Sequence, residues 1–301
     1  MPKKMPARFT DVDAARAHLE GIRWPDGPIC PHCGVIDHAS AIKGGRKGLM
    51  FCNACRMQFS VTVGTVFERS KIPLNTWLYA NHLLCSSKKG ISSHQLSRML
   101  GVTYKTAWFM AHRIRKAMEP GSNAGPLGGE GKTIEADETY IGIRAGETPG
   151  HGGGAHKIAV MGLVERGGRV RTFKLGKATK KGAQAVLHTN VDRKSVLMTD
   201  ESKLYQRDTG MTHHAVNHSA GEYVRGDVHT NTIEGVFSVF KRGMIGTYQH
   251  CGEQHLDRYL AEFDFRYSTR TAMGIGDDGR ADLALKGITG KRLTYRRINE
   301  A

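Results

Sequence analysis

The chain has 301 residues, of which 39% are hydrophobic, so it can form one large domain or two to three smaller ones. Its formal net charge of +16 predicts attraction to nucleic acid or another anionic surface. Its apolar runs are shorter than the roughly 18 residues of a membrane span, and its first residues lead into no signal-peptide core. We therefore expect a cytoplasmic, nucleoid-associated protein with no membrane partner.

The positive charge is concentrated in the first part of the chain. Residues 1–125 hold 18 Lys and Arg against 7 Asp and Glu, whereas residues 126–301 hold 26 against 21. We expect residues 1–125 to bind DNA through contacts with its phosphates.

Within an N-terminal segment, 1–66, four cysteines form two Cys-x-x-Cys pairs separated by 18 residues: Cys30, Cys33, Cys52 and Cys55. This spacing is typical of a tetrathiolate zinc ribbon, in which each pair aims two sulfurs at one point. A closed shell of four sulfurs makes the Zn²⁺ structural. The alternative is four unrelated thiols, which the glycine-rich hairpin between the pairs disfavours. Cys85 and Cys251 have no partner at useful spacing and are interpreted as packing residues.

The next region, 67–120, has the pattern of a helix-turn-helix. After a strand over 58–63 and a helix over 77–87, a short helix meets a turn at Gly101, and Thr103 is placed to cap a second helix. The second helix of such a motif enters the major groove by its N-terminal residues. The alternative is a helical hairpin with a solvated basic face. The side chains expected to contact DNA bases or phosphates are Tyr104, Lys105, Thr106, Arg113, Arg115 and Lys116.

A Gly- and Pro-rich stretch over 121–132 reads as a linker. It resembles a phosphate-binding loop only faintly, because Pro126 stands where that motif needs glycine. From residue 133 to 270 we expect an α/β domain, a mixed sheet flanked by helices. The expected strands span 133–143, 156–164, 169–173 and 195–199, and the expected helices span 182–188 and 253–267. Residues 271–301 read as a mobile basic C-terminal tail.

Acidic residues in this domain are the candidates for divalent-cation chemistry. Asp137 lies mid-strand, where a turn role is implausible, and Asp200 follows a short apolar strand. Glu135 shares a strand face with Asp137, and charge there needs compensation by a metal or a base. Glu234 lies in a helical run seven residues before Lys241, so both side chains lie on the same side of the expected helix. Mg²⁺ or Mn²⁺ prefers such oxygen ligands.

These motifs together resemble the ISXO-like bacterial insertion-sequence transposases, which carry a zinc ribbon before a DDE-type catalytic domain. The resemblance covers most of the chain: the two cysteine pairs, the helix-turn-helix, the Asp137 strand, Thr199-Asp200 and the run from His229 through Glu234 to Lys241. It implies an RNase H-like catalytic domain with Asp137 and Asp200 as the first two metal ligands. The third ligand is either Glu234 or Asn231. The negative charge of Glu234, and the position of Lys241 two helical turns after it, favour Glu234.

The resemblance implies a DNA transposase that binds terminal inverted repeats and catalyses Mg²⁺-dependent strand cleavage and strand transfer, as a homo-oligomer on double-stranded DNA. Two alternatives stay open: a zinc-ribbon DNA-binding regulator with an inactive nuclease domain, and an RNase H-type structure-specific nuclease. His229 is expected near the site. The other histidines considered are expected in solvated loops: His151, His156, His213, His214 and His218.

Overall fold

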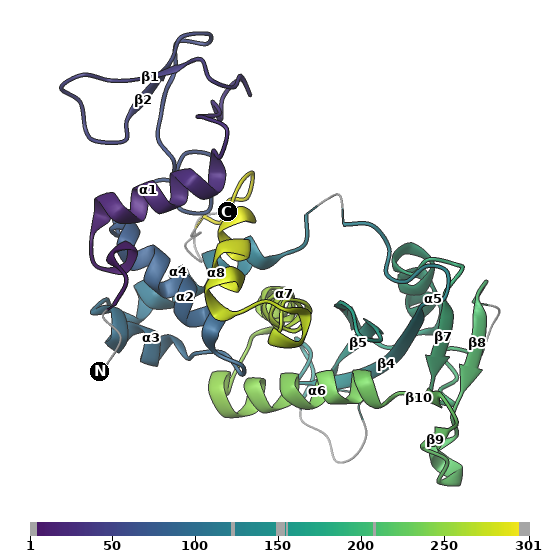
Figure 1. Ribbon diagram of the computed structural model, residues 1–301. Helices are drawn as coiled ribbons and strands as arrows, with labels where there is room; N and C mark the ends of the chain where they lie inside the picture. Colours follow the sequence, from purple (N-terminus) through teal and green to yellow (C-terminus); the bar gives the residue numbers. More distant parts are fainter. Residues whose placement is uncertain (1–4, 122–123, 149–153, 155, 207–208, 295–301) are drawn as a thin grey trace. The chain divides into compact units, whose positions relative to one another are not determined.

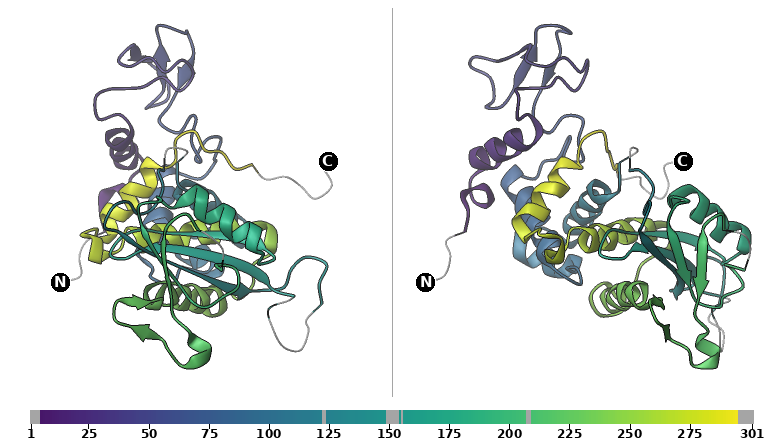
Figure 2. Two further views of the ribbon diagram at one scale, coloured as in Figure 1. Left: turned by 90° about the vertical axis from the view of Figure 1, so that its right-hand side faces the viewer. Right: turned by 45° about the vertical axis from the view of Figure 1, so that its right-hand side comes forward.

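The chain forms two units in a computed structural model, which describes residues 5–121, 124–148, 154, 156–206 and 209–294. Unit 1 combines the chain up to Glu119 with the chain from Gly276 onward, and unit 2 is Pro120–Ile275. Figures 1 and 2 show the elements of each unit. Among the residues described, none of the helices has the length and apolar character needed to cross a bilayer.

Unit 1 joins a small three-stranded antiparallel sheet to a group of helices. The sheet has the order β1-β2-β3. Cys30 and Cys33 precede β1, Cys52 ends β2, and Cys55 lies in the turn between β2 and β3. Two helices were not expected from the sequence: the first in the unit, α1, and the last, α8. The elements are η1 (Ala7–Phe9), α1 (Val12–Arg23), β1 (Ala39–Ala41), β2 (Met50–Cys52), β3 (Gln58–Phe59), α2 (Leu74–Ser86), α3 (Ser93–Leu100), α4 (Tyr104–Met118) and α8 (Asp277–Lys286).

The predicted pair of helices is present as α3 and α4. Gly101 takes a left-handed conformation after α3, and the Thr103 side chain accepts a hydrogen bond from the Thr106 backbone N–H to cap α4. The residues expected to face inward on α4 are buried: Ala107, Met110, Ala111, Ile114 and Met118. The expected strand over 58–63 is wrong beyond Phe59, because the Val63 backbone N–H bonds to Ser60 O and closes a turn there.

The C-terminal region differs from the expected mobile tail over residues 277–286. Helix α8 packs against α2 and α4 within unit 1. Asn81 Nδ2 on α2 donates to Ala281 O at 2.9 Å, and Arg280 Nη1 donates to Cys85 O at 3.0 Å. Helix α8, which comes late in the sequence, thus completes the helical core of unit 1.

Unit 2 is built on a five-stranded mixed sheet of order β6-β5-β4-β7-β8. Strands β4, β5 and β6 are antiparallel neighbours, and β7 and β8 continue the sheet from β4 in parallel. This mixed α/β architecture is consistent with the expected RNase H-like domain. The strands are β4 (Thr133–Ile141), β5 (Ile158–Glu165), β6 (Val170–Gly176), β7 (Val196–Thr199) and β8 (Thr212–Ala215), with a separate hairpin of β9 (Val224–Arg225) and β10 (Val228–His229).

Helices cover both faces of this sheet, which is why β5 is buried along nearly its whole length. On one face Val160 packs with Phe237 of α6 (Asn231–Gly243) and Phe263 of α7 (Leu256–Ser268). On the other face Met161 packs with Leu187 of α5 (Lys180–Asn190). The chain between α6 and α7 forms one π-helical segment, Met244–Tyr248, and the short 3-10 helix Glu253–His255.

Part of the expected linker is fixed on unit 2. Leu127 is fully buried and forms a parallel bridge with Val191, and the Gly129 backbone N–H donates to Ser195 Oγ at 2.9 Å. These contacts hold the chain beside the start of β7 just before it enters β4.

Candidate functional site

The four cysteines of the ribbon converge on one point. Their sulfur atoms all lie within 4.8 Å of one another, with 3.6 Å between Cys30 and Cys55 and 3.7 Å between Cys33 and Cys52. The backbone turns are suited to this, since Gly34 and Arg56, each directly after a pair, take positive φ angles. The backbone N–H groups of Cys55 and Ala54 lower the pKa of the Cys52 thiol to about 6. This donor set fits a tetrahedral Zn²⁺ with no open position.

Strands β4 and β7 bring the first two acids together. The parallel register pairs Glu135 with Met198, and continued by two residues it sets Asp137 level with Asp200, directly after β7. Burial, followed by the negative charges of Asp200, Glu138 and Glu234, raises the pKa of Asp137 to about 7. Burial also raises the pKa of Asp200. These carboxylates therefore lie close enough to destabilise one another's charge.

Helix α6 brings Glu234 to the same face. Its apolar side chains Ile233 and Phe237 lie over Gly162 on β5, the residue paired with Asp137. A Cβ on Gly162 would approach Ile233 Cδ1 to 2.6 Å, so the absence of a side chain lets α6 approach the sheet there. Glu234 itself is exposed, and its Oε1 accepts a hydrogen bond from Thr230 Oγ1 at 2.8 Å.

Glu135 has a different environment from Asp137, although both lie on the same face of β4. Its side chain is fully buried, and Arg166 Nε donates to its Oε1 at 2.6 Å. At the start of α6 the backbone N–H groups of Thr232 and Ile233 donate to its Oε2 at 2.8 and 3.0 Å. The charge of Glu135 is thus compensated by an arginine and a helix N-terminus, which is where anions are stabilised.

Glu138, on the opposite face of β4, positions the loop after β7. Ser202 Oγ and Tyr205 OH donate to its carboxylate at 3.0 and 2.9 Å, and the Ser202 backbone N–H donates to Asp200 Oδ1 at 3.0 Å. Ser202 therefore links the acid on β4 to the acid after β7. No role was predicted for Glu138 or Ser202 from the sequence.

The remaining α6 candidates are exposed on the helix surface. Asn231 is the first residue of α6, one turn before Glu234, and Lys241 lies in its last turn. Their roles stay predictions.

The histidines expected in solvated loops divide into several environments. His151 lies outside the described residues, His156 is half-buried in the turn before β5, and His214 is exposed but lies on strand β8. His213, on β8, is half-buried with Nε2 2.9 Å from Thr199 Oγ1. The expectation is wrong for His218, whose Nε2 lies 3.9 Å from Glu234 Oε1. His229, expected near the site, contacts Glu135 Oε1 through Nδ1 at 3.4 Å.

The predicted DNA-contacting residues of α4 separate into exposed and buried groups. Tyr104 and Lys105 are exposed at its N-terminal end, Thr106 beside them is half-buried, and Lys116 pairs with Glu119 at the other end.

Arg113 and Arg115 are buried, at 7% and 0% exposure, so their assignment to phosphate contacts is wrong. Arg113 Nη2 instead donates to Glu68 O at 2.7 Å, and its guanidinium stacks over Trp77. Helices α2 and α8 pack on α4 within unit 1, and these packed helices leave both guanidinium groups away from the surface.

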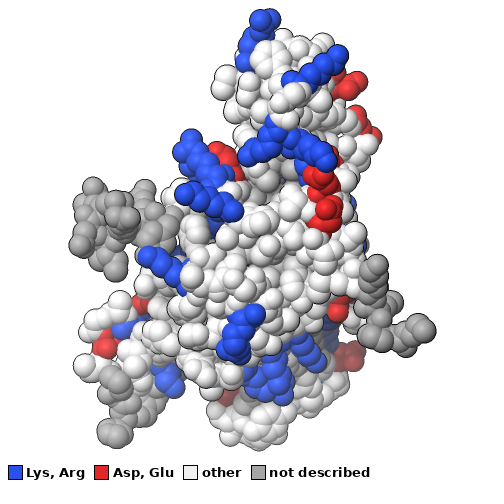
Figure 3. All heavy atoms as spheres, turned by 90° about the vertical axis from the view of Figure 1, so that its left-hand side faces the viewer, with Lys and Arg blue, Asp and Glu red and all other residues white. Residues whose placement is uncertain are grey.

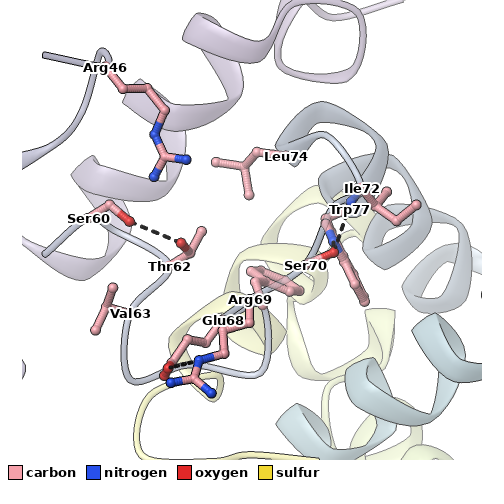
Figure 4. A pocket seen from close by; sticks show the side chains of 11 residues that line it. Arg46, Ser60, Thr62, Val63, Glu68, Arg69, Ser70, Ile72, Leu74 and Trp77 are labelled. Atoms are coloured by element: carbon pink, nitrogen blue, oxygen red, sulfur yellow. Dashed lines mark hydrogen bonds and ion pairs between the residues drawn. The ribbon is translucent and has the colours of Figure 1, made fainter. Parts of the chain in front are cut away.

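Unit 1 also contains a polar hollow of about 350 Å³ close to the ribbon (Figure 4). Arg46, from the loop between β1 and β2, and Arg69, before α2, line different parts of it. The hydroxyl groups of Ser60, Thr62 and Ser70 also line it. Two arginine side chains together with hydroxyl donors can bind a phosphate group. On the face of the molecule in Figure 3, Lys and Arg side chains occupy more surface than Asp and Glu.

Comparison with known proteins finds similarity to transposases in both parts of the chain. Residues 126–268 match the family described as ISXO2-like transposase domain, and residues 11–58 match the transposase zinc-ribbon domain. Both matches are to transposase families, one through the ribbon and the other through most of unit 2. It is also 29% identical, over 279 residues, to an uncharacterized protein in transposable element ISH50 of Halobacterium salinarum. That alignment covers 86% of this chain and 91% of the relative.

The two family domains coincide with the two clusters of candidate ligands. The transposase zinc ribbon contains all four cysteines and α1, whose Asp11 side chain caps the helix by accepting from the Ala14 backbone N–H. That capping residue is the signal by which α1 could have been found. The ISXO2-like transposase domain contains Asp137, Asp200 and Glu234. The family therefore confirms the recognised resemblance, while the role of each residue is a separate question.

Proposed function

We propose that this protein binds the terminal inverted repeats of an insertion sequence and catalyses divalent-cation-dependent DNA strand cleavage and strand transfer. Asp137, Asp200 and Glu234 are the proposed cation ligands. The observation that carries the proposal is geometric: the parallel register of β4 and β7 sets Asp137 level with Asp200, and α6 packs over Gly162, the partner of Asp137 on β5. The raised pKa of Asp137, caused by burial and by the carboxylates of Asp200, Glu138 and Glu234, supports it. Three stretches of chain far apart in sequence thus bring negative charge to one place.

The donor set fits Mg²⁺ or Mn²⁺. Carboxylate oxygens are the ligands these ions prefer. Arg166 and the N-terminus of α6 neutralise Glu135, whereas the Asp137 side chain accepts a hydrogen bond from the backbone N–H of Glu138 at 2.7 Å. A bound cation would compensate the charge of Asp137. When bound, such cations stabilise the attacking and leaving oxygens of a phosphodiester displacement.

Glu234 is the preferred third ligand. Its charge acts on Asp137, which supports a position facing the site. Asn231 lies one turn earlier on the same helix and would contact a cation or DNA from there. Lys241, two turns after Glu234, would bind a DNA phosphate beside the cation site.

Unit 1 is the proposed DNA-binding part. Tyr104, Lys105 and Thr106 lie on the exposed end of α4, where a recognition helix reads the major groove. Lys116 would supply a phosphate contact. The zinc ribbon would hold its loops in shape around a structural Zn²⁺. On DNA we expect more than one copy of the chain, since two element ends must be joined to one target, and we expect the protein at the nucleoid.

The function is tested with purified full-length protein, a DNA fragment carrying the element end and a supercoiled target. We expect Mg²⁺-dependent nicking at the element end, followed by covalent joining of its 3′ end to the target. Asp200→Asn should abolish both steps and leave end binding within about twofold.

Each other outcome contradicts the proposal in a distinct way. Specific end binding without cleavage by the wild type would identify a regulator. Cleavage of branched or hybrid substrates without any joining would identify a structure-specific nuclease. Loss of end binding in Asp200→Asn would contradict the assignment of binding to unit 1.

A further inference from the structure

The segment between β8 and α6 is fixed beside Asp200 through the next residue in the chain, Glu201. The backbone N–H of His218 donates to Glu201 Oε2 at 2.8 Å, and the backbone N–H of Ser219 donates to Glu201 Oε1 at 2.9 Å. Ser219 Oγ donates to the same oxygen at 2.5 Å. Because Glu201 follows Asp200 directly, the start of the short 3-10 helix His218–Ala220 is held near that acid.

The imidazole of His218 is directed toward the acidic cluster. Its Nε2 lies 3.9 Å from Glu234 Oε1, and its charge acts on Asp200. This nitrogen is shielded from solvent and makes no hydrogen bond to the described part of the chain. The other side of the ring stacks on Tyr223, with centroids 4.9 Å apart and an angle of 29° between the planes. A buried polar nitrogen without a hydrogen bond requires an explanation.

We propose that His218 Nε2 is a nitrogen ligand to one of the divalent cations held by Asp200 and Glu234. The proposal rests on the proposed function, since it adds a ligand to the same cation site. Ligand atoms about 2.1 Å from a cation, in neighbouring positions, lie about 3 Å apart. The 3.9 Å between His218 Nε2 and Glu234 Oε1 therefore needs a displacement of about 1 Å, which side-chain rotation supplies.

A nitrogen ligand changes which cation the site prefers. Imidazole suits transition metals, whereas Mg²⁺ prefers an all-oxygen shell. The site should therefore bind Mn²⁺ more tightly than Mg²⁺. The competing explanation is an ion pair, in which a protonated His218 only fastens its segment to Glu234.

Pulsed electron paramagnetic resonance of Mn²⁺ separates these explanations, because it detects a nitrogen bonded directly to the ion. The sample is the full-length, zinc-loaded protein without DNA. We expect a coordinated-nitrogen signal in the wild type that changes when histidine is labelled with ¹⁵N. The signal should disappear in His218→Gln and persist in His214→Gln, a matched exchange of an exposed histidine on β8. The affinity for Mn²⁺ should fall about tenfold in His218→Gln and stay within twofold in His214→Gln.

Failure of this proposal is distinguishable from failure of the proposed function. Mn²⁺ that binds the wild type, is lost in Asp200→Asn and shows no coordinated nitrogen would overturn the role of His218 and leave the acidic site intact. Mn²⁺ binding that Asp200→Asn does not weaken would overturn both. Retention of the nitrogen signal in His218→Gln would assign it to another histidine and would also overturn the proposal.

Discussion

Glu135 on β4 accepts a hydrogen bond from the backbone N–H of Thr232, in the first turn of α6, at 2.8 Å. Each of these residues lies two positions before a proposed cation ligand, Asp137 in one case and Glu234 in the other. Thr232 Oγ1 donates to the same carboxylate at 2.8 Å. The buried acid therefore sets where α6 starts relative to the sheet, and so where Glu234 lies relative to Asp137.

Glu135→Gln should lower both stability and activity. The exchange removes the buried negative charge that Arg166 and the N-terminus of α6 compensate, and breaking a buried ion pair typically costs about 3 kcal/mol. Urea unfolding of the full chain should show this loss, with cleavage reduced at least tenfold. Glu147→Gln removes an exposed ion pair with Arg144 and serves as the control, with an expected change of at most about 0.5 kcal/mol. Equal changes in the two variants would contradict a positioning role for Glu135.

Gly162→Ala should displace α6. The added methyl group would lie 2.6 Å from Ile233 Cδ1 and 2.8 Å from Phe237 Cζ, and since both side chains are buried in the core, we expect the helix to move with them. Such overpacking typically costs about 1–3 kcal/mol. We expect cleavage to fall at least tenfold while end binding stays within twofold. Gly21→Ala on α1, where the methyl group meets nothing within 4 Å, should leave cleavage unchanged. Wild-type cleavage by Gly162→Ala would show that the approach of α6 does not position the site.

Asp137→Asn should stabilise the protein when no divalent cation is present. The pKa of Asp137 is raised to about 7 in the folded state, by burial and by Asp200 and Glu138. The folded state thus holds a proton on Asp137 that the unfolded state loses near pH 4, and stability falls as pH rises from about 4 to 7.

At pH 8 asparagine removes this buried charge, so urea unfolding in a chelator should show a gain of roughly 1–3 kcal/mol. Near pH 4 the gain should disappear, since Asp137 is then protonated in the folded state. Added Mg²⁺ should stabilise the wild type more than Asp137→Asn. A loss of stability at pH 8 would show that the charge of Asp137 is compensated within the protein.

Lys105→Ala and Arg113→Ala should have different effects, although both remove a cation from α4. Lys105 is exposed near the N-terminus of α4, so its loss should weaken end binding and lower the slope of log affinity against log salt by about 1. Arg113 is buried against Glu68 O and Trp77, so its loss should destabilise unit 1. Thermal unfolding and binding at several salt concentrations separate the two effects. An unchanged salt slope in Lys105→Ala would remove that end of α4 from the DNA interface.

The zinc site and the strand acids could be predicted because their signals are local. The two Cys-x-x-Cys turns converge through their own backbone conformation, with Gly34 and Arg56 at positive φ. Asp137 and Asp200 lie on, or directly after, apolar strands that pair in parallel. In both cases neighbouring residues determine the geometry.

The features that were missed depend on contacts between distant segments. Arg113 reads as an exposed cation until Glu68 and Trp77, both much earlier in the chain, are placed against it. Glu135 and Asp137 have the same position in the strand pattern, and only the location of Arg166 and of the α6 N-terminus distinguishes them. His218 lies in a polar segment that resembles a solvated loop, and its approach to Glu234 follows from the Glu201 contacts.

The most direct test of the cation site is anomalous diffraction from crystals of the full-length protein soaked in Mn²⁺. We predict an anomalous peak coordinated by carboxylate oxygens of both Asp137 and Asp200, with Glu234 at the same site, and no such peak in Asp200→Asn. Full occupancy of the zinc ribbon together with no Mn²⁺ peak between Asp137 and Asp200 would contradict it.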